Sequence, residues 1–369
     1  MKTRISIRRL AGTLAVLATA ASGLSALATS ASAATGPTAT LRQGIATVTG
    51  TPARDVIAIT VGPNRLAVDF GSDSTVDAHF AMSQVQGVNV LAGDGDDGVA
   101  VNGSGVGDVP ITVRAGAGND GGGVVGNIGD SGDGDAPVTI NGREGNDNFG
   151  VSVPGPTTVN AGAGNDVVDG GGAGIGHETI SLGDGNDRFV SELSAFVGSR
   201  IRSDVVDGGT GLDTLEMRGS FASESVGLSA NAGHLLVEHD LRDHVDADNI
   251  EHVSWFGFGG LDEGGGGDAV SVRDLSGTDV VNFTPNFSAP NDATAPNNSA
   301  DQLTVFGTAG DDHITVSGAG ANITVAGLTP TVTPVLLDSK DVLQIDTLAG
   351  RDTVDRHALQ RGLVQLRVL

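Results

Sequence analysis

The sequence contains no cysteine, and only 3% of its 369 residues are aromatic. Without cysteine the chain forms no disulfides, and we expect another kind of cross-link to take their place. Lysine occurs only at Lys2 and Lys340, and the formal net charge is −25. Such acidity opposes binding to nucleic acid or to an anionic membrane surface and favours cations.

Sequence motifs of several classes of site are also missing. The chain has no Gly-x-Ser-x-Gly, no His-Glu-x-x-His and no Walker lysine. It also lacks the Asp-x-Asp-x-Asp-Gly loop of an EF-hand. The chain therefore lacks the usual sequence signatures of serine hydrolases, zinc proteases and nucleotide-binding enzymes, and we expect no enzymatic activity.

Glycine, in contrast, is abundant, with 58 residues. Glycine at this level without a three-residue period excludes collagen and would usually suggest disorder. However, 38% of the residues are hydrophobic, and they gather in short runs such as Val138–Ile140 and Asn322–Val325. Such runs are typical of strands, and no segment after the N-terminus shows a 3.6-residue pattern, so we predict an all-β fold.

The N-terminal segment has the pattern of a secretory signal. Four basic residues precede an apolar run from Leu10 to about Leu27, and Ala31-Ser32-Ala33 has the small-x-small form of a cleavage site. We therefore predict a signal peptide at residues 1–33 and a secreted, extracellular product. A membrane anchor is disfavoured because glycine, serine and threonine dilute the apolar run, and no second run is long enough to span a bilayer.

One short motif recurs through the middle of the chain. Ala161–Val168 reads Ala-Gly-x-Gly-Asn-Asp-x-Val, and Leu182–Phe189 reads Leu-Gly-x-Gly-Asn-Asp-x-Phe. A repeat with a period of a few tens of residues indicates a solenoid, a propeller or an array. Aligned on its aspartate, the motif recurs every 19 to 27 residues, at Asp97, Asp120, Asp147, Asp166, Asp187 and Asp213.

The segment Gly208–Glu216 matches the nonapeptide Gly-Gly-x-Gly-x-Asp-x-apolar-x at every fixed position. These repeats resemble the hemolysin-type (RTX) calcium-binding repeats of secreted bacterial proteins. The resemblance implies a right-handed parallel β-roll or β-helix solenoid, here with coils of about 20–22 residues. In that family, turns that carry the glycine-aspartate motif, which we call marked turns, occupy both sides of each coil. Here one side is marked, so we expect a single file of Ca²⁺ ions between Asp97 and Asp213.

The spacing of the motif suits a cation site. Each coil should run strand, turn, strand, turn, with glycine where the turn needs a positive φ or a close backbone approach. The next coil stacks about 4.8 Å away, so oxygens of two successive turns enclose one ion. Mixed carboxylate and carbonyl ligands suit Ca²⁺ better than Mg²⁺. Besides the six aspartates, the candidate metal-site residues are Gly95, Gly118, Gly145, Gly164, Gly185 and Gly211.

An apolar residue follows two positions after most of these aspartates and should point into the solenoid. Gly122 departs from this rule, so the coil of Asp120 should be the loosest. The expected inward ladder comprises Val99, Phe149, Val168, Phe189, Leu215, Val270, Ile314 and Val354.

The spacing widens toward both ends of the chain. Asp55 precedes Asp97 by 42 residues and Asp312 precedes Asp352 by 40, which predicts an unmarked coil within each gap. Asp268, Asp312 and Asp352 are therefore secondary metal candidates, since each lacks an adjacent marked turn. We expect N-terminal coils at 34–90, the calcium-binding repeats at 91–220, an irregular insert at 221–262 and a C-terminal β-solenoid module at 263–369.

The expected insert is rich in histidine. The spacings of its histidines match neither a zinc-protease helix nor a zinc finger. We interpret these residues as solvent-facing strand residues: His234, His239, His244 and His252.

The sequence thus predicts a secreted calcium-binding β-solenoid with a structural or interaction role and with folding coupled to calcium. An extracellular adhesin that binds a glycan or a cell surface is the alternative. A polysaccharide lyase or epimerase is less well supported, because such enzymes need a basic residue to neutralise a uronate and arginine is scattered here. The physiological partner and the oligomeric state are left open.

Overall fold

The computed structural model describes residues 36–106, 109–128, 136–170, 177–192, 202–220, 223–240, 243–257, 267–289, 292–297 and 299–369. The predicted signal peptide at 1–33 lies outside the described residues. Thr35–Leu369 form one compact unit.

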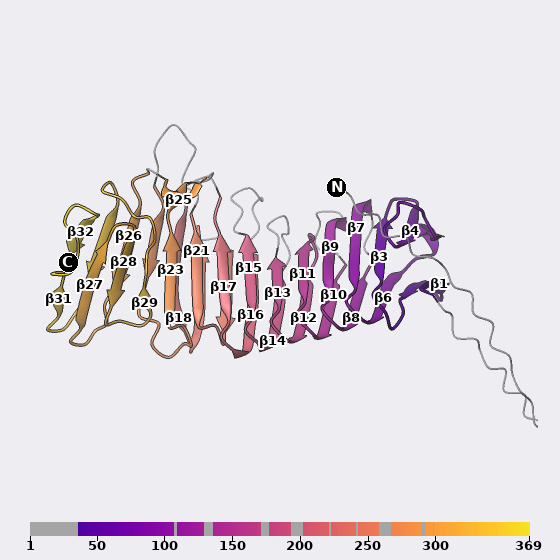
Figure 1. The fold of residues 1–369 in the computed structure, drawn as a ribbon, viewed down its shortest axis with the longest axis horizontal. Coiled ribbons are helices and arrows are strands. Elements are labelled where there is room, and N and C mark those ends of the chain that lie inside the picture. The colour runs from indigo at the N-terminus through magenta and orange to yellow at the C-terminus, as the bar shows by residue number, and fades with distance from the viewer. Residues whose placement is uncertain are drawn as a thin grey trace, which may run out of the picture. The chain divides into compact units, whose positions relative to one another are not determined.

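Two long β-sheets make up this unit (Figure 1). Sheet A holds, in spatial order, β1 (Thr38–Arg42), β2 (Ile45–Thr49), β6 (Gly87–Asp94), β8 (Ile111–Ala117), β10 (Val138–Glu144), β12 (Thr157–Ala163), β14 (Glu178–Gly185), β16 (Arg202–Gly211), β20 (Asp243–Asp248), β19 (His234–His239), β18 (Ser225–Asn231), β22 (Ala269–Val272), β26 (Gln302–Phe306), β30 (Val342–Asp346) and β32 (Gln365–Val368).

Sheet B has as many strands as sheet A. Its spatial order is β5 (Ala78–Ala81), β4 (Arg65–Phe70), β3 (Val56–Val61), β7 (Gly98–Val106), β9 (Gly121–Ile128), β11 (Asn148–Ser152), β13 (Val167–Gly170), β15 (Arg188–Glu192), β17 (Thr214–Arg218), β21 (His252–Phe256), β23 (Asn282–Asn286), β29 (Thr331–Val332), β28 (Asn322–Ala326), β27 (His313–Ala319) and β31 (Thr353–Asp355). A separate two-stranded sheet joins β24 (Ser288–Ala289) and β25 (Asp292–Pro296).

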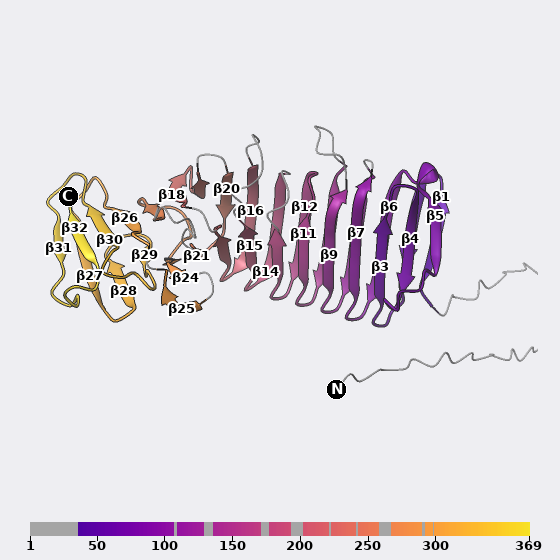
Figure 2. The same cartoon turned by 90° about the horizontal axis from the view of Figure 1, so that it is seen from above.

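In the middle of the unit the chain alternates between the two sheets. Each coil gives one strand to sheet A and the next to sheet B, and both strands pair in parallel with those of the following coil, as for β10 with β12 and β11 with β13. The same succession is visible in the turned view (Figure 2). The predicted all-β parallel solenoid is therefore confirmed. We call the turns that lead from sheet A into sheet B the A-to-B turns and those that return the B-to-A turns.

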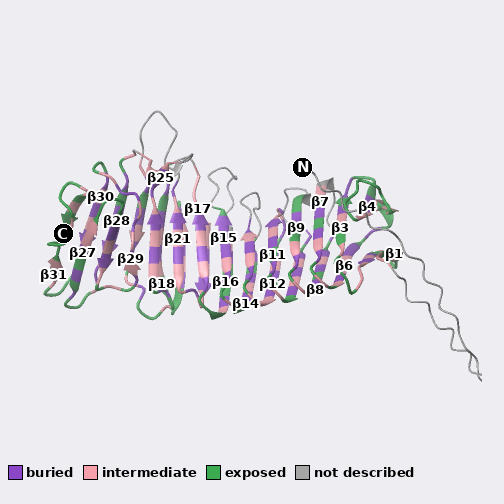
Figure 3. Cartoon of the chain, viewed as in Figure 1, coloured by how far each residue is buried: buried purple, intermediate pink, exposed green. Residues whose placement is uncertain are grey.

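The hydrophobic core lies between the two sheets. Buried and more exposed residues alternate along the strands (Figure 3), because successive side chains of a strand point to opposite faces of its sheet. Within sheet B, Phe149 pairs in register with Val168, and Val168 with Phe189. All three are at most 2% exposed. The predicted inward ladder is confirmed for these residues and for Val99, Leu215 and Ile314, whereas Val354 is only partly buried. Val270 is buried too, but it belongs to sheet A and not to this ladder.

The predicted unmarked coils at the two ends are wrong. The backbone N–H of Asp55 donates directly to Oδ1 of Asp97 at 2.7 Å, so their coils are neighbours. The additional residues form strands β4 and β5, which extend sheet B in antiparallel fashion beyond β3. Asp312 and Asp352 are neighbours in the same way, at 3.0 Å, and β28 and β29 lie between them in sequence.

The segment 221–262 is not irregular over its described residues. Strands β18, β19 and β20 form an antiparallel meander inside sheet A, and β21 returns to sheet B. The β18–β19 turn contains Ala232 and Gly233, both with positive φ, as a tight hairpin requires. The single helical element of the described residues is the three-residue 3₁₀ turn Met82–Gln84, and none of their helices could cross a membrane.

Candidate metal-binding turns

The marked motif forms the A-to-B turns in the middle of the solenoid. Its two glycines adopt positive φ, as in Gly162 at 125° and Gly164 at 136°. A Cβ atom on either would overlap a carbonyl oxygen of the preceding coil, that of Arg143 or of Gly145. The glycines are needed because these carbonyls approach the next turn so closely.

Arg143 occupies the position of the first of these glycines in its coil. Its φ is 112°, a backbone conformation that residues other than glycine rarely adopt, and its side chain is exposed. The turn geometry is therefore imposed by the stacked coils even where the residue does not favour it.

The aspartates of the marked turns form a hydrogen-bonded ladder. All six are buried, with at most 4% of their surface exposed. In each case Oδ1 accepts the backbone N–H of the corresponding aspartate in the preceding coil, as when Asp166 donates to Asp187 at 2.7 Å. The same bond, at 2.7–2.8 Å, joins Asp55 to Asp97, Asp97 to Asp120, Asp120 to Asp147, Asp147 to Asp166 and Asp187 to Asp213.

Glu251 ends this ladder. Its Oε2 accepts the backbone N–H of Asp213 at 2.7 Å. The turn that carries Glu251 is shorter than the marked turns, since Asp207 pairs with Asp248 and Thr214 with His252. The longer glutamate side chain bridges a gap that an aspartate fills elsewhere, and sequence reasoning missed it because no glycine motif precedes it.

The second carboxylate oxygen distinguishes the middle turns from the end turns. In the middle turns Oδ2 is buried without a hydrogen-bond partner among the described residues, as in Asp166 and Asp187. In the first turn Oδ2 of Asp55 accepts both the backbone N–H and the hydroxyl of Thr51. The orphaned oxygens belong to Asp97, Asp120, Asp147, Asp166, Asp187 and Asp213.

Of the secondary candidates, Asp312 resembles Asp55. Its Oδ2 accepts the Thr308 backbone N–H at 2.8 Å and its Oδ1 the Thr308 hydroxyl at 2.9 Å. Threonine in place of the motif glycine therefore satisfies the carboxylate from within its own turn. Asp352 is half-buried, and its Oδ1 accepts the Asp312 N–H.

The buried carboxylates have raised pKa values. Burial is the main cause, and it raises the pKa of Asp147 to about 7 and those of Asp97, Asp166 and Asp213 to about 6. The backbone N–H bond opposes this rise, and neighbouring carboxylates such as Asp120 and Asp166 beside Asp147 add to it. The pKa values of Asp120 and Asp187 are raised as well, again mainly by burial. Without protons or a cation, this row of charges is unfavourable.

A second row runs along the exposed edge of the same turns. The asparagine that precedes several of these aspartates accepts the backbone N–H of the residue at its position in the next coil, as from Asn146 to Asn119 at 2.7 Å and from Asn165 to Asn146 at 2.6 Å. In these bonds the acceptor belongs to the preceding coil of each pair, whereas in the aspartate ladder the acceptor belongs to the following coil. A turn that carries both residues is thus tied to both of its neighbours.

The oxygen atoms that the A-to-B turns offer as metal ligands fit a hard cation. It offers the orphaned Oδ2 atoms and main-chain carbonyl oxygens that point toward the next coil. No group of three or more histidine, aspartate or glutamate side chains within the described residues is arranged to hold a metal. A bound ion would therefore depend on one or two carboxylates together with backbone carbonyls.

Asp268 does not belong to this ladder, contrary to the sequence alignment. It precedes β22 of sheet A and therefore lies in a B-to-A turn. It takes part in a second buried ladder, in which Glu224 donates to Asp268 at 3.0 Å, Asp268 to Asp301 at 2.8 Å and Asp301 to Asp341 at 2.9 Å. Sequence reasoning missed Asp301 and Asp341, although each, like Asp268, precedes two alternating apolar residues.

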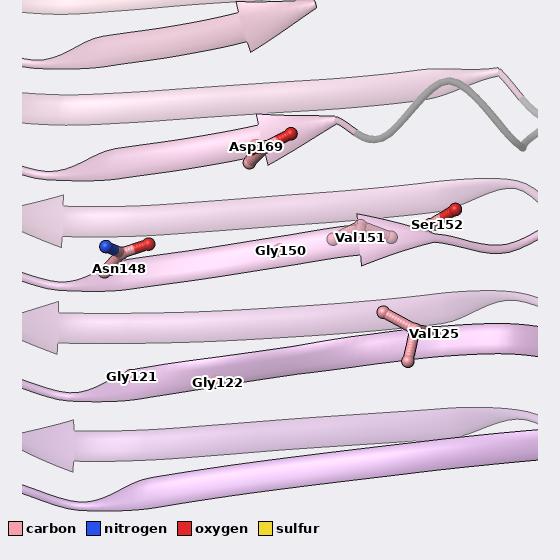
Figure 4. A pocket seen from close by; sticks show the side chains of 8 residues that line it. All are labelled: Gly121, Gly122, Val125, Asn148, Gly150, Val151, Ser152 and Asp169. Atoms are coloured by element: carbon pink, nitrogen blue, oxygen red, sulfur yellow. The ribbon is translucent and has the colours of Figure 1, made fainter. Parts of the chain in front are cut away.

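A shallow hollow of about 560 Å³ lies over β9, β11 and β13 (Figure 4). Gly121, Gly122 and Gly150 leave it unfilled, and Asn148, Ser152 and Asp169 supply its polar groups. Gly122, the residue that interrupts the inward ladder, thus borders unfilled space. The lining contains one carboxylate and no basic side chain, so it gives no support to a uronate-cleaving site.

No model of a known protein family matches the sequence, and no similar sequence was found among curated proteins.

Proposed function

We propose that this chain is a secreted calcium-binding β-solenoid of the hemolysin-repeat type, with a structural or interaction role and with the folding of residues 91–220 coupled to calcium. The observation that carries the proposal is the row of six buried, orphaned aspartate oxygens in consecutive A-to-B turns. The outer A-to-B turns of Asp55 and Asp312 satisfy their aspartates internally, so among the A-to-B turns the orphaned oxygens coincide with the glycine motif. Orphaned oxygens also occur in the B-to-A turns, at Asp268, Asp301 and Glu224.

The energetics favour an ion in these turns. A buried carboxylate without a partner costs several kcal/mol, and adjacent like charges add about 1 kcal/mol or more per pair. A divalent cation between successive turns would neutralise two carboxylates and take further ligands from the carbonyl oxygens of the turns. Calcium suits these ligands because it accepts six to eight oxygens in flexible geometry, which Mg²⁺ does not.

Calcium titration tests the proposal. The chain from residue 34 would be freed of metal with EGTA and titrated with CaCl₂ and, separately, MgCl₂, followed by calorimetry and by hydrogen exchange with mass spectrometry. We expect heat from several calcium sites and new protection confined mainly to residues 91–220. Full protection of that segment in EGTA, unchanged by calcium, would contradict the proposal.

An adhesin is the second candidate function, favoured by the hollow beside Asn148, Ser152 and Asp169. Its amide, hydroxyl and carboxylate groups stand beside the methyl groups of Val125, a combination suited to sugar hydroxyls and C–H faces. A glycan array with the calcium-loaded chain tests this candidate. Gly150→Thr would fill the hollow without a steric clash, since a Cβ atom there meets nothing nearer than 4.0 Å, and it should abolish any binding seen.

A further inference from the structure

The B-to-A turns carry their own buried acidic line. Glu178 and Asp204 belong to its N-terminal part, where Glu178 donates its backbone N–H to Asp204 at 3.1 Å. Glu224, Asp268, Asp301 and Asp341 continue it beyond the meander. All six are at most 6% exposed. The meander β18–β20 separates the two parts, because β19 and β18 lie between β20 and β22 in sheet A.

His239 lies at this interruption. It ends β19, and its side chain is 2% exposed, so the prediction of a solvent-facing residue is wrong for this histidine. Three carboxylates surround the ring: Nε2 lies 3.5 Å from Oε1 of Glu224 and 3.5 Å from Oδ2 of Asp240, and Nδ1 lies 3.6 Å from Oδ2 of Asp243.

The three carboxylates come from three different parts of the meander. Glu224 precedes β18 and is fully buried, Asp240 follows β19, and Asp243 begins β20. Asp240 also closes the meander by accepting the backbone N–H of Ser225 at 2.8 Å. A positive charge on His239 would therefore attract carboxylates from the segment before β18, the residue after β19 and the start of β20. A neutral ring would leave Glu224 buried without a counter-charge among the described residues.

We propose that His239 is a built-in imidazolium cation that balances the carboxylates of Glu224, Asp240 and Asp243, so that the meander is held at this interruption by an internal ion cluster and not by a bound metal. Of the acidic line itself, His239 contacts Glu224, and Oδ2 of Asp268 and of Asp301 stay without a hydrogen-bond partner among the described residues. The contrast with a metal-dependent A-to-B corner rests on the proposed function, whereas the charge state of His239 does not. The chain would then combine a calcium-controlled row of turns with a meander held by an internal ion cluster.

The electrostatics of the cluster support this assignment. Burial alone would lower the pKa of His239, but Asp243, Glu224 and Asp240 outweigh burial and raise the pKa to about 9. The exposed His234 provides a natural comparison. It is 48% exposed and pairs with Asp246 at 3.0 Å on the other face of the same strand.

NMR of the chain labelled with ¹⁵N-histidine tests the charge directly. The His239 signal would be assigned by its loss in His239→Gln, and the spectra would be recorded at pH 7.5 with EGTA and again with calcium. We expect both His239 ring nitrogens to carry protons under both conditions. A neutral His239 ring at pH 7.5 would overturn the proposal whether or not the protein binds calcium.

Hydrogen exchange tests the role of the charge. In His239→Gln, peptides covering 223–240, 243–257 and 267–272 should exchange at least about ten-fold faster, with or without calcium, because a buried carboxylate has lost its partner. His234→Gln is the matched control and should change exchange by less than about two-fold. The double variant Glu224→Gln with His239→Gln should recover part of the protection, since it removes both charges. Unchanged exchange in His239→Gln would contradict the proposed role.

Discussion

Asp166 donates its backbone N–H to Oδ1 of Asp187 at 2.7 Å, while Oδ2 of Asp187 has no hydrogen-bond partner among the described residues. One oxygen of this carboxylate therefore joins two coils, and the other is available to a cation. The two roles are separable, because asparagine keeps the Oδ1 acceptor but loses the charge.

The first prediction concerns Asp187→Asn and Asp187→Ala. In EGTA, Asp187→Asn should shift residues 91–220 toward the folded form by about 1 kcal/mol, seen as slower hydrogen exchange, since a buried charge is removed while the coil-to-coil bond remains. It should also weaken calcium binding at the adjacent turns by at least about ten-fold. Asp187→Ala should destabilise the chain by about 1–3 kcal/mol, because the Asp166 N–H loses its acceptor.

Asp55→Asn is the matched control for these variants. Thr51 already satisfies the Asp55 carboxylate, so the substitution should leave calcium binding unchanged in calorimetry. Equal losses of calcium affinity in Asp55→Asn and Asp187→Asn would show that the orphaned oxygens do not define the sites.

The second prediction concerns the motif glycines. Gly164→Ala introduces a Cβ against the Gly145 carbonyl at a φ of 136° and should lower the free energy of unfolding by at least about 1 kcal/mol. Gly150→Ala, in a strand where the added Cβ meets nothing nearer than 4.0 Å, should change stability by less than about 0.5 kcal/mol. Urea unfolding in the presence of calcium measures both, and equal effects would contradict the close approach of the coils.

The third prediction concerns Arg143. Its φ of 112° is one that glycine adopts freely, and its side chain is exposed. Arg143→Gly should therefore raise the melting temperature, through a stabilisation of about 1 kcal/mol. Arg114→Gly is a suitable control, since Arg114 lies in β8 without positive φ and should lose stability on substitution. A lower melting temperature for Arg143→Gly would show that the turn is not strained.

The fourth prediction concerns pH. Folding raises the pKa of Asp147 from an ordinary 3.8 to about 7 and that of Asp166 to about 6. At a pH between the ordinary and the raised pKa, the folded calcium-free chain therefore binds more protons than the unfolded chain. Its stability should be highest below about pH 4 and should fall as the pH rises toward 7. Saturating calcium should reduce this dependence, because the ion replaces the protons. Urea unfolding from about pH 4 to pH 7.5, with and without calcium, measures the slope, and a calcium-free chain that gains stability with rising pH would contradict the sign.

Much of the candidate site could be predicted from the sequence, because its residues lie close together along the chain within one turn. The glycine-aspartate motif specifies the turn conformation, and the apolar residue two positions after the aspartate marks the strand that follows, as in Phe149 and Phe189. Glu251 could not be predicted in the same way. Its role follows from a shortened turn that only the pairing of β17 with β21 reveals.

The all-β repeat, the inward alternation and the six motif aspartates are readable from the amino-acid order, since each depends on residues within one turn or strand. Three relationships emerge only in the folded chain: Asp55 and Asp97 are neighbours, Asp268 lies in a B-to-A turn, and His239 faces inward. The physical reason is that strands of the two sheets look alike locally. A hairpin or meander inserted between coils therefore changes which residues meet without changing the local pattern.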